Sequence, residues 1–180
     1  HENYCQNFAQ LNFLGMRIDG SKALKDENGV VSSHFMGQSS FSNYALGYEN
    51  NVVKVRDDAP LELLGPLGCG IQTGAGTFMR SMACEAGSAV AIAGGGAVGL
   101  SAVLGAVVQG CNPIIVIEPH ANRRELAIEV GATHGIDPMA TEDLTTAIRE
   151  IAPNGVNYAL DTTSIQPVLD GLFPAMAAGG

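Results

Sequence analysis

The sequence predicts an α/β fold in which a doubly wound parallel sheet occupies the second part of the chain. From about Pro66 onward, short apolar runs alternate with Ala- and Gly-rich helical stretches, a pattern typical of βαβ units. The chain holds 23 glycines, and only 15% of its residues are charged, which suits a buried sheet with tight turns. Residues 1 to about 70 are more polar, and the alternating runs Gly29–Phe35 and Asn51–Val55 predict antiparallel strands.

Strands and helices are expected to alternate in the second region. The predicted strands are Ala89–Ala93, Pro113–Glu118 and Gly155–Leu160. The predicted helices are Ala97–Gln109, Ala121–Val130, Thr141–Ala152 and Ile165–Ala177. Gly131 occupies a C-cap position, and Pro153 ends the third helix. Thr141 is the expected N-cap of that helix, with acidic residues in its first turn.

A glycine-rich segment follows the first of these strands and opens the first helix. Gly94-Gly95-Gly96-Ala97-Val98-Gly99 matches the pattern G-x-G-x-x-G. Gly94 permits the tight turn, Gly96 lets the backbone approach a pyrophosphate, and Gly99 lets the helix pack closely on the sheet. The amides at the helix N-terminus then meet the phosphate charge. This setting predicts a Rossmann-type dinucleotide site; the alternative is a turn that serves only helix–strand packing.

An acidic residue, Glu118, ends the second predicted strand and lies 19 residues after Gly99. A carboxylate at this spacing accepts hydrogen bonds from the hydroxyls of the adenosine ribose and disfavours a 2′-phosphate. Arg123 and Arg124 have the opposite tendency, because an arginine near the ribose can accommodate that phosphate. The carboxylate acts more directly, so the sequence predicts a preference for NAD over NADP.

Charge and composition exclude several classes of partner. The net charge of −9, with only nine basic residues and no run of them, argues against nucleic-acid and anionic-membrane surfaces. The longest apolar stretch, Gly87–Val108, is interrupted by glycines and does not predict a membrane span. The four cysteines are widely spaced and follow no secretory leader, so we expect a cytoplasmic protein without disulfides.

Several segments together resemble the zinc-dependent medium-chain alcohol dehydrogenases. The most specific is Gly65-Pro66-Leu67-Gly68-Cys69-Gly70-Ile71-Gln72-Thr73-Gly74, upstream of the glycine motif. Residues 39–45 (Ser-Ser-Phe-Ser-Asn-Tyr-Ala) and 159–163 (Ala-Leu-Asp-Thr-Thr) fit the same family. Leu11-Asn12-Phe13 and Asp19-Gly20-Ser21 are closer to its aryl-alcohol, or benzyl-alcohol, branch. The resemblance covers essentially the whole chain and is densest from Phe41 to Val130.

The resemblance implies two incomplete domains. Residues 1–70 would be the C-terminal part of a GroES-like, β-rich catalytic domain, and residues 71–180 a Rossmann NAD-binding domain truncated at its C-terminus. The chain starts at His1 rather than at a methionine, so we expect a fragment of a longer protein. The implied activity is hydride transfer between a primary alcohol and NAD, with zinc activating the alcohol oxygen; the branch resemblance favours an aromatic alcohol.

Two cysteines match zinc ligands of the family. Cys69 matches a ligand of the catalytic zinc, whose other protein ligands, a Cys and a His, are expected upstream of residue 1. Cys5 matches the last of four cysteines that bind a structural zinc. A zinc held by three protein ligands keeps a position open at which a bound alcohol loses its proton more readily. A lone cysteine is otherwise a small apolar residue, and a single thiolate binds zinc poorly.

The remaining site residues implied by the resemblance contact coenzyme or substrate. Besides residues 94–99 and Glu118, they are Thr73 near the nicotinamide, Arg123 near the ribose, Thr162 and Thr163 along the coenzyme cleft, and Phe35 and Met36 in the substrate pocket. Phe35 and Met36 are equally compatible with an ordinary core role. The four histidines lack ligand spacing, and only His120 is expected near the adenine.

Two other functions fit part of this pattern. One is a zinc-free medium-chain reductase of the quinone oxidoreductase type, although the Gly-Cys-Gly segment at residues 68–70 argues against it. The other is a non-catalytic NAD-binding module. In each case the partner is a small molecule, an alcohol or aldehyde for the dehydrogenase, and the full-length protein is expected to form a homo-oligomer.

Overall fold

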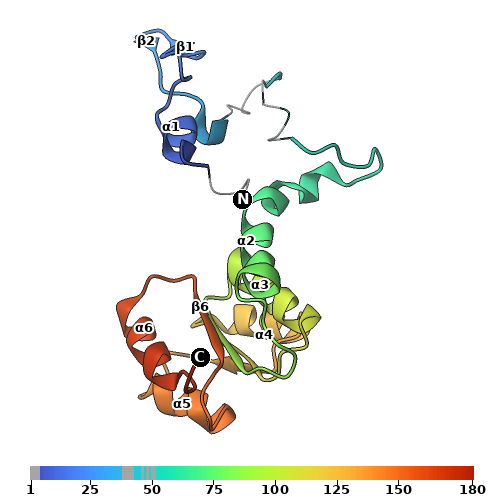
Figure 1. The fold of residues 1–180 in the computed structure, drawn as a ribbon, viewed down its shortest axis with the longest axis vertical. Helices are drawn as coiled ribbons and strands as arrows, with labels where there is room; N and C mark the ends of the chain where they lie inside the picture. The colour runs from blue at the N-terminus through green and yellow to red at the C-terminus, as the bar shows by residue number, and fades with distance from the viewer. Residues whose placement is uncertain (1–4, 38–42, 46, 48, 50–51) are drawn as a thin grey trace. The chain divides into compact units, whose positions relative to one another are not determined.

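The structure, a computed structural model, describes residues 5–37, 43–45, 47, 49 and 52–180 (Figure 1). The chain divides into two compact units, His1–Ala59 and Pro60–Gly180, and each is described by itself. Residues 60–69 therefore group with the second unit. The assignment of residues 1–70 to a GroES-like domain stays a prediction, and part of the predicted segment 39–45 lies outside the described residues.

A parallel four-stranded sheet forms the centre of the second unit. Its strands are β3 (Val90–Ala93), β4 (Ile114–Ile117), β5 (His134–Ile136) and β6 (Tyr158–Asp161), in the spatial order β5-β4-β3-β6. The chain moves outward from β3 to β5 and then returns to place β6 on the other side of β3. This reversal reproduces the first four strands of a Rossmann sheet. The predicted fold class is confirmed for this unit.

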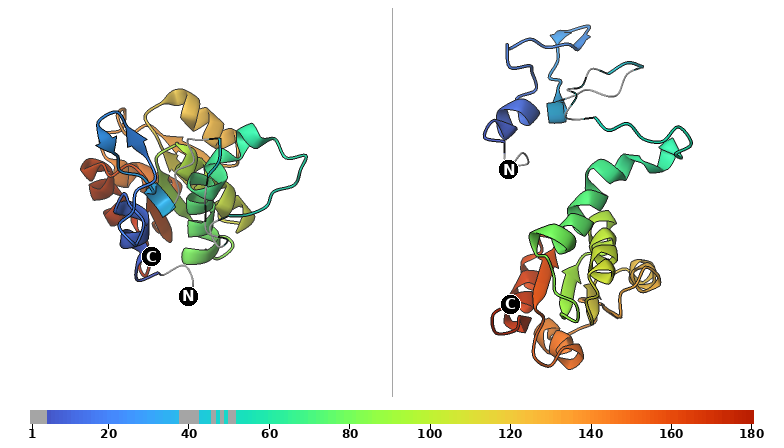
Figure 2. Two further views of the ribbon diagram at one scale, coloured as in Figure 1. Left: turned by 90° about the horizontal axis from the view of Figure 1, so that it is seen from above. Right: turned by 45° about the vertical axis from the view of Figure 1, so that its right-hand side comes forward.

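Helices cover both faces of the sheet (Figure 2). The helices are α3 (Ala97–Val108) and α4 (Ala121–Glu129) on one face, and α5 (Leu144–Ile151) and α6 (Gln166–Leu172) on the other. Alternate residues of each strand point to opposite faces, so Ile92 packs in the first core and Ala91 in the second. The central strands β3 and β4 are buried along their whole length, which explains their uninterrupted apolar sequence.

A further helix, α2 (Gly70–Gly76), packs closely on α3, and two glycines make this possible. A Cβ atom at Gly74 would lie 2.0 Å from the carbonyl oxygen of Val98. A Cβ atom at Gly105 would lie 2.9 Å from the carbonyl oxygen of Ala75. The glycine content of this region therefore serves helix–helix contact as well as the turn after β3.

Most predicted elements of the second unit are confirmed, with shifted ends in its last third. Helix α5 begins later than predicted and its N-cap is Asp143, whose side chain accepts the Thr145 N–H at 3.0 Å. The prediction of Thr141 as the N-cap was wrong, because the Thr141 hydroxyl donates instead to the Asp137 carbonyl. The acidic residues expected in the first turn of α5 consequently precede the helix. Strand β5 was not predicted, because only its last residue, Ile136, is buried.

The last strand and helix are shorter than predicted. Strand β6 begins at Tyr158, and the preceding Val156 makes only an isolated bridge to Met176. Helix α6 ends at Leu172, and residues 173–175 form a tighter turn that contains Pro174. Proline has no N–H to donate, which prevents the α-helical pattern from continuing through it.

The first unit contains α1 (Phe8–Phe13) and a short antiparallel ribbon of β1 (Lys25–Asp26) and β2 (Gly29–Val30). The predicted strand Gly29–Phe35 was wrong beyond Val30, because His34 has a left-handed backbone (φ +64°) that ends the extended run. The predicted strand at residues 51–55 was also wrong for residues 52–55, which are exposed and pair with no strand; Asn51 lies outside the described residues.

Short helical segments lie between or after the helices and strands given above. They are η1 (Phe35–Gly37), η3 (Leu61–Leu63), η4 (Gly65–Gly68), η5 (Thr77–Ser81) and η6 (Phe173–Ala175). Within the part of the chain that the structure describes, no helix combines the length and apolar character required to cross a membrane.

Candidate functional site: the carboxyl ends of the parallel strands

The strand register brings three predicted site segments to one edge of the sheet. Ala93 pairs with Ile117 on one side and with Asp161 on the other. The residues that follow these three strands are Gly94, Glu118 and Thr162, and they therefore emerge side by side. Ligands of open α/β sheets bind at this edge, next to the point where the strand order reverses.

The glycine bend, residues 94–99, has no room for side chains at its two ends. Gly94 has a left-handed backbone (φ +99°), and a Cβ there would lie 2.2 Å from the Thr162 hydroxyl oxygen. A Cβ at Gly99 would lie 1.8 Å from the Gly94 carbonyl oxygen. At Gly96, in contrast, a Cβ would meet no atom within 4 Å. The bend is therefore open at Gly96, as the approach of a phosphate group requires, whereas a Cβ at the neighbouring Gly95 would lie 3.0 Å from the Glu118 side chain.

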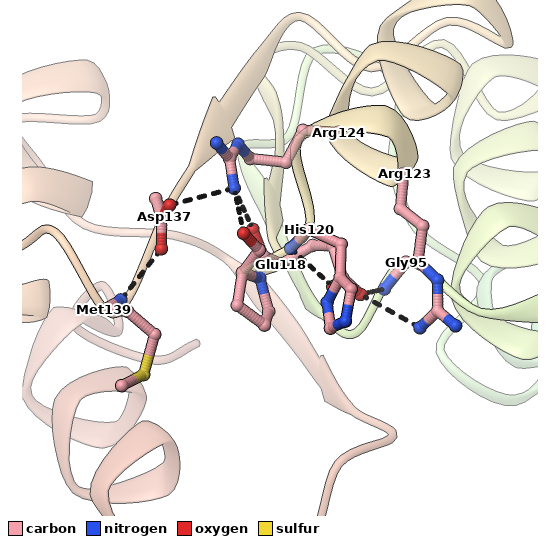
Figure 3. A network of polar contacts seen from close by, with 8 residues as sticks. Gly95, Glu118, His120, Arg123, Arg124, Asp137 and Met139 are labelled. Atoms are coloured by element: carbon pink, nitrogen blue, oxygen red, sulfur yellow. Dashed lines mark hydrogen bonds and ion pairs between the residues drawn. The ribbon is translucent and has the colours of Figure 1, made fainter.

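Glu118 is directed toward this bend, as Figure 3 shows. Its Oε2 accepts the Gly95 N–H, with 2.8 Å between nitrogen and oxygen. Its Oε1 lies 2.9 Å from the backbone nitrogen of His120 and 2.8 Å from His120 Nδ1. The side chain is only 4% exposed. One carboxylate thus connects the end of β4 to the glycine bend.

Opposing effects act on the pKa of Glu118. Burial of the carboxyl group raises the pKa, because the charged form loses its hydration. The hydrogen bonds from His120 and Gly95, together with the charge of Arg123, lower it, and they outweigh burial. The pKa of Glu118 therefore lies below its ordinary value, and the group is a carboxylate at neutral pH.

This lowered pKa predicts an acid-sensitive contribution to stability. Because Glu118 binds its proton less readily in the folded state, its stabilising contribution is complete above the ordinary carboxyl pKa, about 4.3, and is lost as the pH falls through the lower folded value. We expect the melting temperature of Glu118→Gln to depend less on pH between about 3 and 6 than that of the wild type. The exposed residue Glu125 provides the control Glu125→Gln. Parallel profiles for all three proteins would contradict the prediction.

The two arginines of α4 have different roles. Arg124 Nη1 donates to the carbonyl oxygens of Glu118 and Pro119, both at 2.7 Å, and lies 3.2 Å from Asp137 Oδ2 (Figure 3). Its side chain is only 22% exposed and is held by these three contacts, so the role of Arg124 is structural. Arg123 is 51% exposed, and its Nη1 lies 3.8 Å from Glu118 Oε2. Of the two, Arg123 has the freedom to reach a ligand.

A cavity of about 580 Å³ opens beside these strand ends. The strand-end cavity is lined by Ile117 at the end of β4 and by Pro119 after it. Residues between Pro138 and Thr145, up to the start of α5, and residues between Thr163 and Gly171, after β6 and in α6, complete the lining. Most of its lining is apolar. It lies on the side of the sheet covered by α5 and α6, next to the segment that carries Glu118.

Cys69 and Thr73 lie at the start of α2. Cys69 is exposed and immediately precedes the helix, and its carbonyl accepts the Thr73 N–H at 2.8 Å. A Cβ at the next residue, Gly70, would lie 3.5 Å from Ala97 Cβ in the glycine bend. The start of α2 therefore lies against the bend.

The other predicted site residues belong to the first unit. Cys5 is exposed, and Phe35 and Met36 form part of an exposed turn, where Phe35 contacts the ring of Phe13. Their predicted roles stay predictions. Among residues 5–37, 43–45, 47, 49 and 52–180, no three His, Cys, Asp or Glu side chains gather into a group that could hold a metal. Cys84 and Cys111 are buried in the core beneath α3.

Several known proteins are similar to this chain in sequence and in fold. The family model described as "Zinc-binding dehydrogenase" matches residues 97–180. A geraniol dehydrogenase of Castellaniella defragrans is 49% identical over 100% of this chain and 48% of the relative. The solved benzyl alcohol dehydrogenase of Acinetobacter calcoaceticus is 45% identical, with a TM-score of 0.90 over 98% of this chain and 47% of that one. Over nearly its whole length the chain is therefore similar to alcohol dehydrogenases, and residues 97–180 match the zinc-binding dehydrogenase family.

A second solved structure is also similar to this chain in sequence and fold. A solved alcohol dehydrogenase zinc-binding domain protein from Burkholderia ambifaria is 48% identical, with a TM-score of 0.90 over 98% of this chain and 48% of that one. The chain spans about half the length of the curated relatives it matches. The family resemblance expected from residues 65–74 and the glycine motif is therefore confirmed.

Two features of the site were not predicted. Asp161 holds the turn after β6, and the strand-end cavity lies between that turn and the loop after β5. The sequence contained a usable signal for the first, because Asp161-Thr162-Thr163-Ser164 is a short polar run directly after an apolar strand. The cavity depends on the packing of distant segments and has no local signal.

Proposed function

We propose that this chain supplies the coenzyme-binding part of an NAD-dependent alcohol dehydrogenase. The observation that carries the proposal is the hydrogen bond from the Gly95 N–H to Glu118, which places an ionised carboxylate next to an open glycine bend. The residues present fit a dinucleotide, because Gly96 leaves space where a diphosphate would approach and no side chain caps the start of α3.

In this proposal each segment holds one part of the coenzyme. The amides of residues 96–98 bind the diphosphate, and Glu118, held by the Gly95 N–H, accepts hydrogen bonds from the ribose hydroxyls, with His120 and Arg123 beside it. The strand-end cavity accommodates the adenine against Pro119 and Thr163. Thr73 and Thr162 flank the rest of the coenzyme along the same edge. Bound NAD would supply the hydride acceptor for alcohol oxidation.

The alcohol and the metal belong to the same proposal. The names of two relatives, geraniol dehydrogenase and benzyl alcohol dehydrogenase, support a primary alcohol next to an unsaturated or aromatic group. Cys69 would provide one thiolate ligand to zinc; the family description supports zinc binding, and the resemblance of residues 65–74 supports Cys69 as the ligand. The described residues offer no complete zinc site, so further ligands would have to come from elsewhere in the protein. Cys5 is the corresponding candidate for a structural zinc.

A binding titration tests the coenzyme assignment. We expect NADH to bind at least about tenfold more tightly than NADPH, because a 2′-phosphate would face the Glu118 carboxylate at short range. Calorimetry or nicotinamide fluorescence measures both dissociation constants in the same buffer. Equal affinities, or tighter binding of NADPH, would overturn the assignment.

An activity assay before and after metal chelation tests the dehydrogenase assignment. The protein is produced with its natural flanking sequence, because its relatives are about twice as long as this chain. We expect reduction of NAD with benzyl alcohol, and loss of that activity on chelation with recovery on addition of zinc. Activity that survives chelation would favour a zinc-free reductase, and coenzyme binding without any turnover would favour a non-catalytic module.

A further inference from the structure

The turn after β6, residues 161–165, is held by one side chain. Asp161 Oδ1 accepts hydrogen bonds from the backbone N–H of Thr163, at 3.0 Å, and from the Thr163 hydroxyl, at 2.6 Å. Asp161 Oδ2 accepts the backbone N–H of Ser164 at 2.9 Å. The Thr163 oxygen in turn accepts the Ile165 N–H at 3.1 Å. Three polar groups of the turn therefore donate to one carboxylate, and a fourth, the Ile165 N–H, donates to the Thr163 hydroxyl that this carboxylate holds.

The conformation held in this way is unusual. Ser164 has a left-handed backbone (φ +56°), which a residue with a side chain adopts only when its surroundings compensate for the cost. Burial raises the pKa of Asp161, but the hydrogen bonds from Thr163 and Ser164 lower it by more, so the carboxyl is ionised at neutral pH. The hydrogen bonds to it are consequently charge-assisted, which makes them stronger than neutral ones.

The turn contributes to two parts of the candidate site. Thr162 contacts the glycine bend, and its hydroxyl donates to the Ala93 carbonyl at 2.8 Å, immediately before Gly94. Thr163 and Ile165 line the strand-end cavity. Asp161 itself does not line that cavity in the structure. Its influence on a ligand would therefore pass through the residues that it positions.

We infer that Asp161 is a positioning residue for the coenzyme: by holding residues 162–165, it fixes one flank of the glycine bend and one wall of the strand-end cavity in their binding geometry. This inference rests on the proposed function, because it assumes that a dinucleotide occupies these two places. The inference extends the proposed function, because it assigns part of the affinity for the dinucleotide to Asp161, a residue that need not touch it.

The test compares Asp161→Ala, Asp161→Asn and a matched control, Asn157→Ala. Asn157 also fixes a backbone N–H through its side chain, that of Ala89 at 2.9 Å, but at the opposite end of the sheet. Calorimetry measures the dissociation constants of NADH and of AMP well below the melting temperature of each protein, and thermal unfolding is recorded separately. AMP probes the nucleoside half without the nicotinamide.

For Asp161→Ala we expect the dissociation constants of NADH and AMP to rise about tenfold, the effect of losing about one net hydrogen-bond contribution. Asp161→Asn keeps one acceptor oxygen but places an amide donor near the Ser164 N–H, so its affinity should lie in between. Asn157→Ala should lower the melting temperature and leave both dissociation constants unchanged. A purely structural role of Asp161 would produce this same pattern for all three variants.

The outcomes separate the two hypotheses. Failure of the wild-type protein to bind NADH would overturn the proposed function. Wild-type binding together with an unchanged affinity in Asp161→Ala would overturn only the role of Asp161. If Asp161→Ala does not fold, Asp161→Asn decides: wild-type affinity in that variant contradicts the inference, and a weakened affinity in the folded protein supports it.

Discussion

Replacing Gly99 with alanine is expected to destabilise the second unit by about 3 kcal/mol, at the upper end of the range for overpacked sites. The added Cβ would lie 1.8 Å from the Gly94 carbonyl oxygen, a backbone atom that no side-chain rotation can move. Helix α3 would have to shift away from β3, which disturbs both the core beneath it and the glycine bend. Thermal or denaturant unfolding measures the loss.

Gly96→Ala is the matched control, because an added Cβ there meets no protein atom within 4 Å. Gly96 has a backbone angle that alanine readily adopts (φ −85°). We expect its stability to stay within about 0.5 kcal/mol of the wild type, as for an unhindered surface change. Its affinity for NADH should nevertheless fall at least about tenfold, because the methyl group occupies the space proposed for the diphosphate. Unchanged NADH affinity in this variant would mean that the bend serves only packing.

Glu118→Gln is expected to produce the largest change in coenzyme preference. The amide oxygen can still accept the Gly95 N–H, but the negative charge that would face the ribose in the proposed complex is removed. We expect the NADH affinity to fall about tenfold and the NADPH affinity to rise, because a charge-assisted interaction is lost and a repulsive one is relieved. Arg123, which is half exposed and 3.8 Å from the present carboxylate, becomes available to the 2′-phosphate.

Titration of both coenzymes measures this change as the ratio of two dissociation constants. Glu125→Gln, an exposed substitution on helix α4, which follows Glu118 in the chain, alters the net charge equally and should leave the ratio unchanged. A double variant, Glu118→Gln with Arg123→Ala, should lose the gain in NADPH affinity if Arg123 provides it. The same ratio in the wild type and in Glu118→Gln would contradict a ribose-binding role for this residue.

The sequence predicted best those elements whose local pattern agrees with their place in the fold. Strands β3 and β4 are apolar throughout because they are buried on both faces, and the bend between β3 and α3 is encoded by glycines that backbone contacts require. Glu118 followed from its position at the end of β4. Where burial is partial, as in β5, the same reasoning found no strand.

The features that escaped prediction depend on side-chain hydrogen bonds and backbone angles that the apolar pattern of the sequence does not encode. The choice of Asp143 over Thr141 as N-cap depends on the Asp137 carbonyl, which competes for the Thr141 hydroxyl. The predicted strand after Gly29 was wrong because backbone turns at His34 and Met36 have left-handed angles that composition does not reveal. The role proposed for Cys69 rests on family resemblance alone, since one cysteine in a glycine-rich turn carries no geometric information about a metal.

The order of strands in the sheet has a consequence for how the molecule opens. The glycine bend follows β3, whose backbone is hydrogen-bonded to β4 on one side and to β6 on the other. Separating β3 from either neighbour breaks a whole ladder of hydrogen bonds, so its amide hydrogens should exchange with solvent only when the sheet itself opens. The start of the bend is therefore anchored in a slowly opening part of the unit, and its geometry should persist through the smaller fluctuations of exposed turns.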